Sequence, residues 1–253
     1  MFKKALRPLA VFLLIAGFIF SACTKYVKKG YMQEAGVAIT FDDDRIDNWF
    51  AYLPFFDSAG IRATFYICKY HLLTPEQKNK LQLLKSHGHE IAYHTTSHHN
   101  MVEYVVRYHH TLEELIHNEI ECDLKKMNQD GFYPITFAYP YGAHTGEYDH
   151  LLQRYFKSVR VLNGSTDYSQ SLAPLDNNKI LYGYGLDKSS KHSDESILKL
   201  MQSAKSNNCC AIFVGHDINK DSKLSVPLDR LAKIVRTVKE LGLKYYTVSE
   251  ISD

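Results

Sequence analysis

The stretch GVAITFDDD, residues 36–44, combines an apolar run with three consecutive carboxylates and decides the fold. Its β-branched and aromatic residues and its length predict a buried parallel strand. Neighbouring carboxylates repel one another, so a cation, a basic partner or water must compensate them. For an isolated aspartate run the simpler interpretation is a helix cap at Asp44, with Asp42 and Asp43 solvated. The residues downstream decide between the two interpretations.

The chain has 253 residues, of which 45% are hydrophobic, and this is enough material for one α/β domain with a full core. Strand-like and helix-like segments alternate along it without repeats or low-complexity segments. This alternation predicts a parallel sheet closed into a (β/α) barrel, with an open doubly wound sheet as the alternative.

The segments are set by periodicity and by end signals such as the capping boxes at Thr74 with Gln77 and at Thr111 with Glu114. The segment between His94 and Thr111, rich in His and Tyr, is expected to be a loop. After the strand at 36–44, we expect helices over 45–58, 74–87, 111–131, 147–157, 193–207 and 228–241, and strands over 61–68, 89–93, 135–138, 159–162, 180–184, 209–214 and 244–248.

The N-terminus carries a secretion signal, in which three basic residues precede an apolar run over 9–20. Small residues directly before Cys23 resemble the lipobox of bacterial lipoproteins, although Phe20 departs from the usual aliphatic residue. We therefore expect a lipoprotein signal peptide over 1–22, a tether over 23–35 and the domain over 36–253. The protein would be exported and anchored by lipid on Cys23 to the bacterial cell envelope, in the periplasm or at the outer membrane; cleavage to a soluble secreted form is the alternative.

Charge and cysteine content narrow the possible partners. Removal of Lys3, Lys4 and Arg7 with the signal lowers the basic residues from 30 to 27, against 28 acidic ones. The mature chain is thus near neutral, and nothing in it predicts binding to nucleic acid. The cysteines other than Cys23 lie mostly in apolar, strand-like runs, and we expect free thiols rather than disulfides.

Polar groups end several of the expected strands. They are the aspartates Asp42 and Asp43, His94 with His98 just beyond, the segment 139–142, and His216. The carboxyl ends of parallel strands form one face of an α/β fold, so these groups should converge there. Two imidazoles and one carboxylate give three protein ligands, which is typical of a catalytic metal site with positions left for water and substrate.

The remaining histidines receive simpler interpretations. His99 and His144 are near enough to these motifs to contact the metal ligands. Other histidines are expected at the surface, namely His87, His89, His109, His110 and His117.

Taken in order, four segments resemble the polysaccharide deacetylase family, also called the NodB-homology domain or carbohydrate esterase family 4. They are TFDD at 40–43, HTTSH at 94–98, FAYPYG at 137–142 and VGH at 214–216. The resemblance covers nearly all of the mature chain and implies a single-domain α/β fold, a distorted (β/α)7 barrel.

The resemblance also implies a role for each site residue and a divalent metal, commonly Zn²⁺. The roles are general base for Asp42, general acid for His216, metal ligands for Asp43, His94 and His98, and an oxyanion donor for the backbone N–H of Tyr141. A bound cation lowers the pKa of its water from about 15.7 toward 7, so a carboxylate suffices as base. The leaving amine needs a proton, which a histidine titrating near neutral pH supplies.

The sequence departs from the family pattern at several positions. Asp44 stands where a glycine is usual, and Val214 replaces the leucine that lines the acetyl-methyl pocket. The arginine of the third motif, which orients the base, is missing. The Asp-Trp motif is also not found, since Trp49 is the only tryptophan.

The expected function is a metal-dependent hydrolase that removes N-acetyl groups from an N-acetylglucosamine-containing polysaccharide at the cell envelope. One alternative is an esterase that removes O-acetyl groups from xylan-like glycans. The other is a carbohydrate-binding protein on the same fold without turnover. In each case the expected partner is an acetylated polysaccharide.

Overall fold

A computed structural model of the chain describes residues 34–252 except 166 and 176. The predicted signal peptide over 1–22 and nearly all of the tether over 23–35, including Cys23, lie outside the described residues. Within the described part, no helix combines the length and apolar character needed to cross a membrane.

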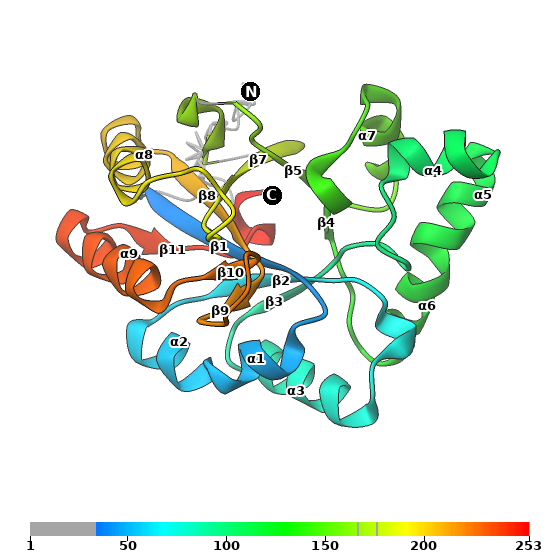
Figure 1. Cartoon of the computed structure of the whole chain (residues 1–253), viewed down its shortest axis with the longest axis horizontal. Coiled ribbons are helices and arrows are strands. Elements are labelled where there is room, and N and C mark those ends of the chain that lie inside the picture. Colours follow the sequence, from blue (N-terminus) through cyan, green and yellow to red (C-terminus); the bar gives the residue numbers. More distant parts are fainter. Residues whose placement is uncertain (1–33, 166, 176, 253) are drawn as a thin grey trace, which may run out of the picture.

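Parallel strands form a closed barrel at the centre of the molecule (Figure 1). Among the described residues, β1 pairs with β2 on one side and with β8 on the other, and this second pairing closes the sheet. The distorted (β/α)7 barrel expected from the sequence is therefore confirmed. In pairing order the barrel strands are β1 (Gly36–Asp43), β2 (Ala63–Ile67), β3 (Glu90–Tyr93), β4 (Thr136–Ala138), β5 (Ser158–Leu162), β7 (Ile180–Gly185) and β8 (Cys210–Gly215).

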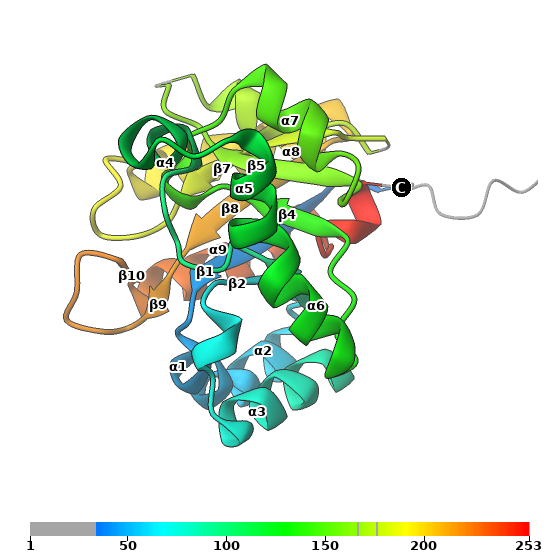
Figure 2. The ribbon, with the colours of Figure 1, turned by 90° about the vertical axis from the view of Figure 1, so that its right-hand side faces the viewer.

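The distortion is concentrated around β8. Its first residues pair antiparallel with the short strand β6 (Leu172–Ala173), and only its later residues pair with β7. A second short strand, β11 (Lys244–Tyr245), pairs with the start of β1. Two further short strands, β9 (Asp217–Ile218) and β10 (Ser225–Val226), pair with each other beyond β8. In Figure 2 they lie with α4 on the side of the barrel opposite the carboxyl terminus.

Helices surround the barrel and cover its outer face (Figure 1). Both predicted capping boxes are formed, at Thr74 with Gln77 and at Thr111 with Glu114. The helices of the described part are α1 (Ile46–Ala51), α2 (Leu53–Ala59), α3 (Pro75–Ser86), α4 (Met101–Tyr108), α5 (Leu112–Ile116), α6 (Cys122–Gln129), α7 (Gly146–Leu152), α8 (Asp194–Asn207) and α9 (Leu228–Leu241).

Three expectations about the helices were wrong in detail. The helix expected over 45–58 is broken at Tyr52, because Pro54 lacks an N–H and its ring clashes with the preceding turn. The helix expected over 111–131 contains a π-helical turn at His117–Glu121. The loop expected between His94 and Thr111 contains α4, which begins where the Asn100 side chain accepts hydrogen bonds from the backbone N–H groups of Val102 and Glu103.

The two faces of the barrel strands are filled differently. On the outer face, Phe41, Trp49 and Phe65 stack against one another in the main core, with ring centroids 5.0 to 6.5 Å apart. The inner face holds small side chains and a few large ones, in a second cluster that includes Ala38, Tyr66, Ala92, Ala138, Leu181 and Ile212. Alternation along each strand thus separates a large outer core from a narrow interior.

His89 is not at the surface, as the sequence had suggested, but is buried with 4% of its area exposed. Its ring packs edge-on against Phe56 and Phe65, and its Nδ1 accepts a hydrogen bond of 3.0 Å from the backbone N–H of Ala63. Burial lowers the pKa of His89 to about 4. His89 is therefore neutral and packs as part of the core.

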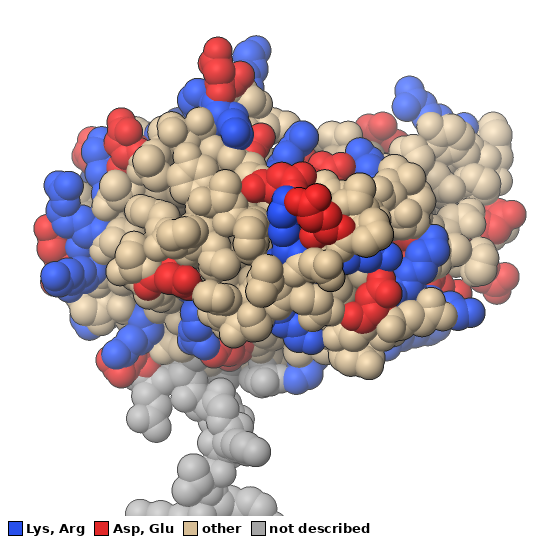
Figure 3. Space-filling model, turned by 90° about the horizontal axis from the view of Figure 1, so that it is seen from below, with Lys and Arg blue, Asp and Glu red and all other residues tan. Residues whose placement is uncertain are grey.

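The described cysteines are free thiols, as the sequence predicts. They are Cys68, Cys122, Cys209 and Cys210, and two of them, Cys68 and Cys210, are buried. On the face seen in Figure 3, acidic and basic side chains are interspersed among uncharged ones.

Gly183 on β7 is the position at which the barrel interior tolerates no side chain. A Cβ atom there would lie 2.1 Å from Cγ2 of Val214 and 3.1 Å from Cδ of Arg160. Gly183→Ala should lower the free energy of unfolding by about 1–3 kcal/mol, the usual effect of overpacking. Urea denaturation measures this loss. Gly146→Ala is the matched control, since nothing lies within 4 Å of its Cβ position, and equal stability of the two variants would contradict the prediction.

Candidate active site

Asp42 and Asp43 lie at the carboxyl end of β1, the strand predicted from residues 36–44. Strict alternation would send Asp43 to the outer face with Phe41, but its backbone φ of 89° interrupts the extended conformation. Aspartate tolerates positive φ better than most residues. Asp44 stands where the family pattern has a glycine, but the residue with positive φ is its neighbour Asp43. Asp44 does not cap α1 either, because the residue at the cap is Arg45 and no side chain bonds there.

Asp43, His94 and His98 form a cluster with the geometry of a metal site. One potential ligand atom from each residue lies within 4.8 Å of the others. Among the described residues, this is the group of His, Cys, Asp or Glu side chains that lie close enough together to share one ion. Oδ1 of Asp43 is 3.1 Å from Nε2 of His98 and 3.8 Å from Nε2 of His94. The sequence prediction that these three side chains converge is confirmed.

Hydrogen bonding and burial set the protonation of His94 and Asp43 in a way that suits cation binding. Nδ1 of His94 donates a hydrogen bond of 2.7 Å to the carbonyl of Ala138, which leaves Nε2 as the lone-pair nitrogen facing Asp43. Burial lowers the pKa of His94 to about 4, so the ring is neutral, as a ligand must be. Burial alone would raise the pKa of Asp43, but interactions with His98, His94 and His216 outweigh it and hold that pKa below its ordinary value. Two imidazoles and a carboxylate are a ligand set that fits a divalent cation such as Zn²⁺.

Asp42 is held by Arg160 inside the barrel. The guanidinium of Arg160 donates a hydrogen bond from Nη2 to Oδ2 of Asp42, and both residues are buried. Oδ1 of Asp42 has no hydrogen-bond partner among the described residues and is free to accept a proton. Arg160 makes a contact with Asp42 of the kind that the resemblance implies for the arginine missing from the third motif. Its sequence signal is a lone arginine within the apolar strand β5.

His216 follows β8 and is fixed from two sides. Its Nδ1 pairs with Oδ2 of Asp187 at 2.6 Å, and its carbonyl accepts a 2.7 Å hydrogen bond from Nε1 of Trp49. Burial lowers the pKa of His216, but the bond to Asp187 and the nearby charges of Asp42 and Asp43 raise it. Together these interactions outweigh the burial, so the net shift of the pKa is upward. Sequence reasoning missed Asp187, which lies in an irregular stretch without a recognisable motif.

Tyr141 lies beside the metal cluster. The residue is 65% exposed, and the centroid of its ring is 5.0 Å from that of His98. The backbone at Tyr141 has a φ of 59°, within the tight turn after β4. The next residue, Gly142, also has positive φ, and a Cβ there would lie 2.7 Å from the backbone nitrogen of Leu162. The oxyanion role of the Tyr141 N–H stays a prediction.

The two histidines near the motifs are not part of the metal cluster. Nδ1 of His99 lies 2.5 Å from Oγ of Ser97, in the loop that carries His98. His144 pairs with Asp149 at 2.9 Å, and Asp149 also accepts a hydrogen bond from the hydroxyl of Tyr139. Both therefore support the segments around the site.

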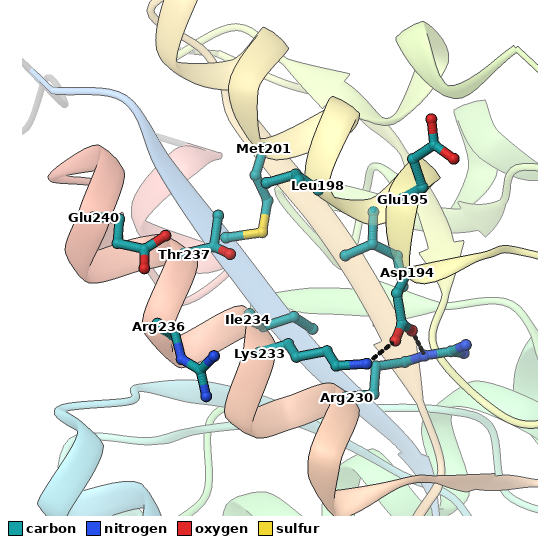
Figure 4. Close-up of a pocket in the computed structure, with 11 residues that line it drawn as sticks. Asp194, Glu195, Leu198, Met201, Arg230, Lys233, Ile234, Arg236, Thr237 and Glu240 are labelled. Carbon is teal, nitrogen blue, oxygen red and sulfur yellow. Dashed lines mark hydrogen bonds and ion pairs between the residues drawn. The ribbon is translucent and has the colours of Figure 1, made fainter.

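Two cavities of similar size differ in their relation to these residues. A groove of about 430 Å³ lies between α8 and α9, where Asp194 pairs with Arg230 and Lys233 (Figure 4). It contains none of the candidate site residues. The other cavity, of about 420 Å³, is lined by His216, Asp187 and Val214 together with the loop 189–192. Of these two cavities, only the second adjoins a candidate site residue, His216.

Solved structures with the same fold include several deacetylases. A "T48 deacetylase with substrate" is 20% identical, with a TM-score of 0.60 over 86% of this chain and 90% of the other. The Bc1960 peptidoglycan N-acetylglucosamine deacetylase is 18% identical, with a TM-score of 0.59 over 88% and 90%. The Xyl-CE4 domain of a multidomain xylanase from the hindgut metagenome of Trinervitermes trinervoides is 19% identical, with a TM-score of 0.56 over 86% and 89%.

Among curated proteins, none matches the chain. The family model for polysaccharide deacetylases matches residues 29–156, which is just over half of the chain and includes Asp42, Asp43, His94, His98 and Tyr141. Together with the barrel and the strand-end cluster, this match establishes that the chain belongs to the polysaccharide deacetylase family, a family of hydrolases.

Proposed function

We propose that this protein is a metal-dependent deacetylase that removes N-acetyl groups from an N-acetylglucosamine-containing polysaccharide of the cell envelope. The observation that carries the proposal is that three sets of groups meet at one end of the barrel. They are the Asp43–His94–His98 cluster, the carboxylate of Asp42 held by Arg160, and His216 held by Asp187.

Each set suits one part of amide hydrolysis. A divalent cation held by Asp43, His94 and His98 would polarise the amide carbonyl and make water acidic enough to attack it. Asp42 takes the proton of the attacking water on its free Oδ1, while Arg160 keeps its other oxygen in place. His216 then gives a proton to the departing nitrogen, because an amine leaves poorly unless it is protonated. The products are acetate and a free amino sugar.

An O-acetyl esterase acting on xylan-like glycans is the second candidate. It is favoured by the likeness to the Xyl-CE4 domain, whose TM-score is close to that of the peptidoglycan deacetylase. An alkoxide leaves more easily than an amine, so an esterase depends less on His216. A carbohydrate-binding protein without turnover is less well supported, because the base, the acid and the metal ligands are all present in the site.

Acetate release from a panel of glycans tests the function. The purified protein should release acetate from chitooligosaccharides or peptidoglycan when Zn²⁺ is added, and lose this activity after chelation. Release from acetylated xylan alone would establish the esterase instead. Glycan binding without acetate release at saturating metal would establish a binding protein.

For localisation, we propose export and anchoring by lipid on Cys23, as the N-terminal sequence predicts. Cys23→Ala should move the protein from the membrane fraction to the soluble fraction of cells and remove its label from incorporated fatty acid. An unchanged distribution of the variant would refute the anchor.

Replacement of the base and of a ligand should have different consequences. Asp42→Asn should retain the metal and lose turnover by a factor of about 10²–10⁴, the usual contribution of a general base. His94→Ala should lose both metal and turnover. Metal content after dialysis and initial rates of acetate release measure the two effects. Near-native turnover in Asp42→Asn would show that another group is the base.

Removal of the charge beside His216 should change the pH profile. Asp187 raises the pKa of His216, so Asp187→Asn should lower that pKa. The general acid is then deprotonated at lower pH, and the alkaline limb of the kcat profile should move toward acid, with a reduced maximum. Rates measured across pH detect the shift, and an alkaline limb at the wild-type position would exclude His216 as the acid.

A further inference from the structure

The loop that carries two of the metal ligands has an unfavourable backbone. Between His94 and His98, Thr95 has a φ of 69° and His98 itself a φ of 62°. The left-handed region is uncommon for residues other than glycine, and for β-branched threonine it is a genuine outlier. A conformation of this kind persists only when surrounding contacts hold it. The position of the His98 ring therefore depends on what those contacts are.

The backbone N–H of Lys69 donates to the carbonyl of Thr95 itself, and Glu119 holds the two residues that follow, Thr96 and Ser97. The backbone carbonyl of Glu119 accepts hydrogen bonds of 3.0 Å from the N–H of Thr96 and from the hydroxyl of Tyr93. Its carboxylate accepts a 3.1 Å bond from the N–H of Ser97 through Oε2, and a second bond from the Ser97 hydroxyl through Oε1. The next N–H, that of His98, is bonded within the loop to Oγ1 of Thr95.

The location of Glu119 explains how one residue can do this. Only 2% of Glu119 is exposed, and it lies in the π-helical turn His117–Glu121 between α5 and α6. π-helical turns are rare and occur often at functional sites. Here the turn presents a carbonyl and a carboxylate of the same residue to consecutive positions of the loop.

We propose that Glu119 is a positioning residue for the metal site, which acts through Thr96 and Ser97 to hold His98 where it can share an ion with Asp43 and His94. The inference rests on the metal site of the proposed function. It assigns a reason to the π-helical turn, and it predicts that Glu119 sets the affinity for the metal without touching it.

Asp123 offers a matched control on the same helical segment. It is fully buried, and its carboxylate accepts bonds from the backbone and ring of His71 and from Lys126. None of these contacts reaches the metal-binding loop. Removal of the Asp123 carboxylate therefore disturbs the same helix, and a comparable buried polar network, without the proposed effect.

The experiment compares Zn²⁺ affinity, measured by competition with a chromogenic chelator, and the visible absorption of the Co²⁺-loaded protein. Glu119→Ala should weaken Zn²⁺ binding by about 10–100-fold and change the Co²⁺ spectrum. Asp123→Ala should bind Zn²⁺ like the wild type even if its thermal stability falls as much. Glu119→Gln should restore most of the affinity, since its amide oxygen can accept from the Ser97 N–H and its amide nitrogen can donate to Oγ.

If Glu119→Ala does not fold, Ser97→Ala provides the decision. It removes the hydroxyl bond to Glu119 and the contact of that hydroxyl with Nδ1 of His99, but it leaves the bond from the Ser97 N–H to Glu119, and it should weaken Zn²⁺ binding several-fold. Wild-type affinity in the Glu119→Ala or the Ser97→Ala variant, or an equal loss in Asp123→Ala, would overturn the inference. A wild-type protein that binds no Zn²⁺ would overturn it together with the metal site. A wild-type protein whose Zn²⁺ affinity depends on Glu119 but which releases no acetate would refute only the proposed deacetylase.

Discussion

The ion pair of Asp42 and Arg160 is the interaction on which the candidate active site depends. A carboxylate inside a barrel loses its hydration, and burial without a partner would favour its neutral form. Arg160 replaces the lost water with a fixed guanidinium, and its stem passes Gly183, where no side chain fits. The barrel interior thus holds the Asp42 carboxylate, paired with Arg160, close to the Asp43–His94–His98 cluster.

The other site groups follow the same pattern, since each reactive side chain is held by a residue from a different part of the chain. His94 is oriented by the carbonyl of Ala138, His216 by Asp187 and Trp49, and the loop before His98 by Glu119. Sites of this kind keep their geometry because the supporting contacts are themselves buried. These contacts offset the free-energy cost of the positive φ angles at Asp43, Thr95 and His98.

The sequence predicted the site residues whose positions follow from the ends of the strands that carry them. Asp43, His94 and His98 each lie at or just beyond a strand end, so alternation of strands and helices was enough to bring them together. It did not predict Arg160, Asp187 or Glu119, because their roles come from contacts with segments more than 20 residues away. Likewise the break at Tyr52 and the helix α4 depend on local backbone detail that the periodicity of apolar residues does not register.

Closure of the barrel has a consequence for how the protein matures. Strand β1 emerges first during synthesis, but one of its edges finds its partner only when residues 210–215 follow. Until then that apolar edge is open to pairing with other chains, which is a known route to aggregation. The same event brings His216, which follows β8, to the end of β1 where Asp42 lies. Closure of the barrel by β8 and assembly of the candidate site therefore coincide.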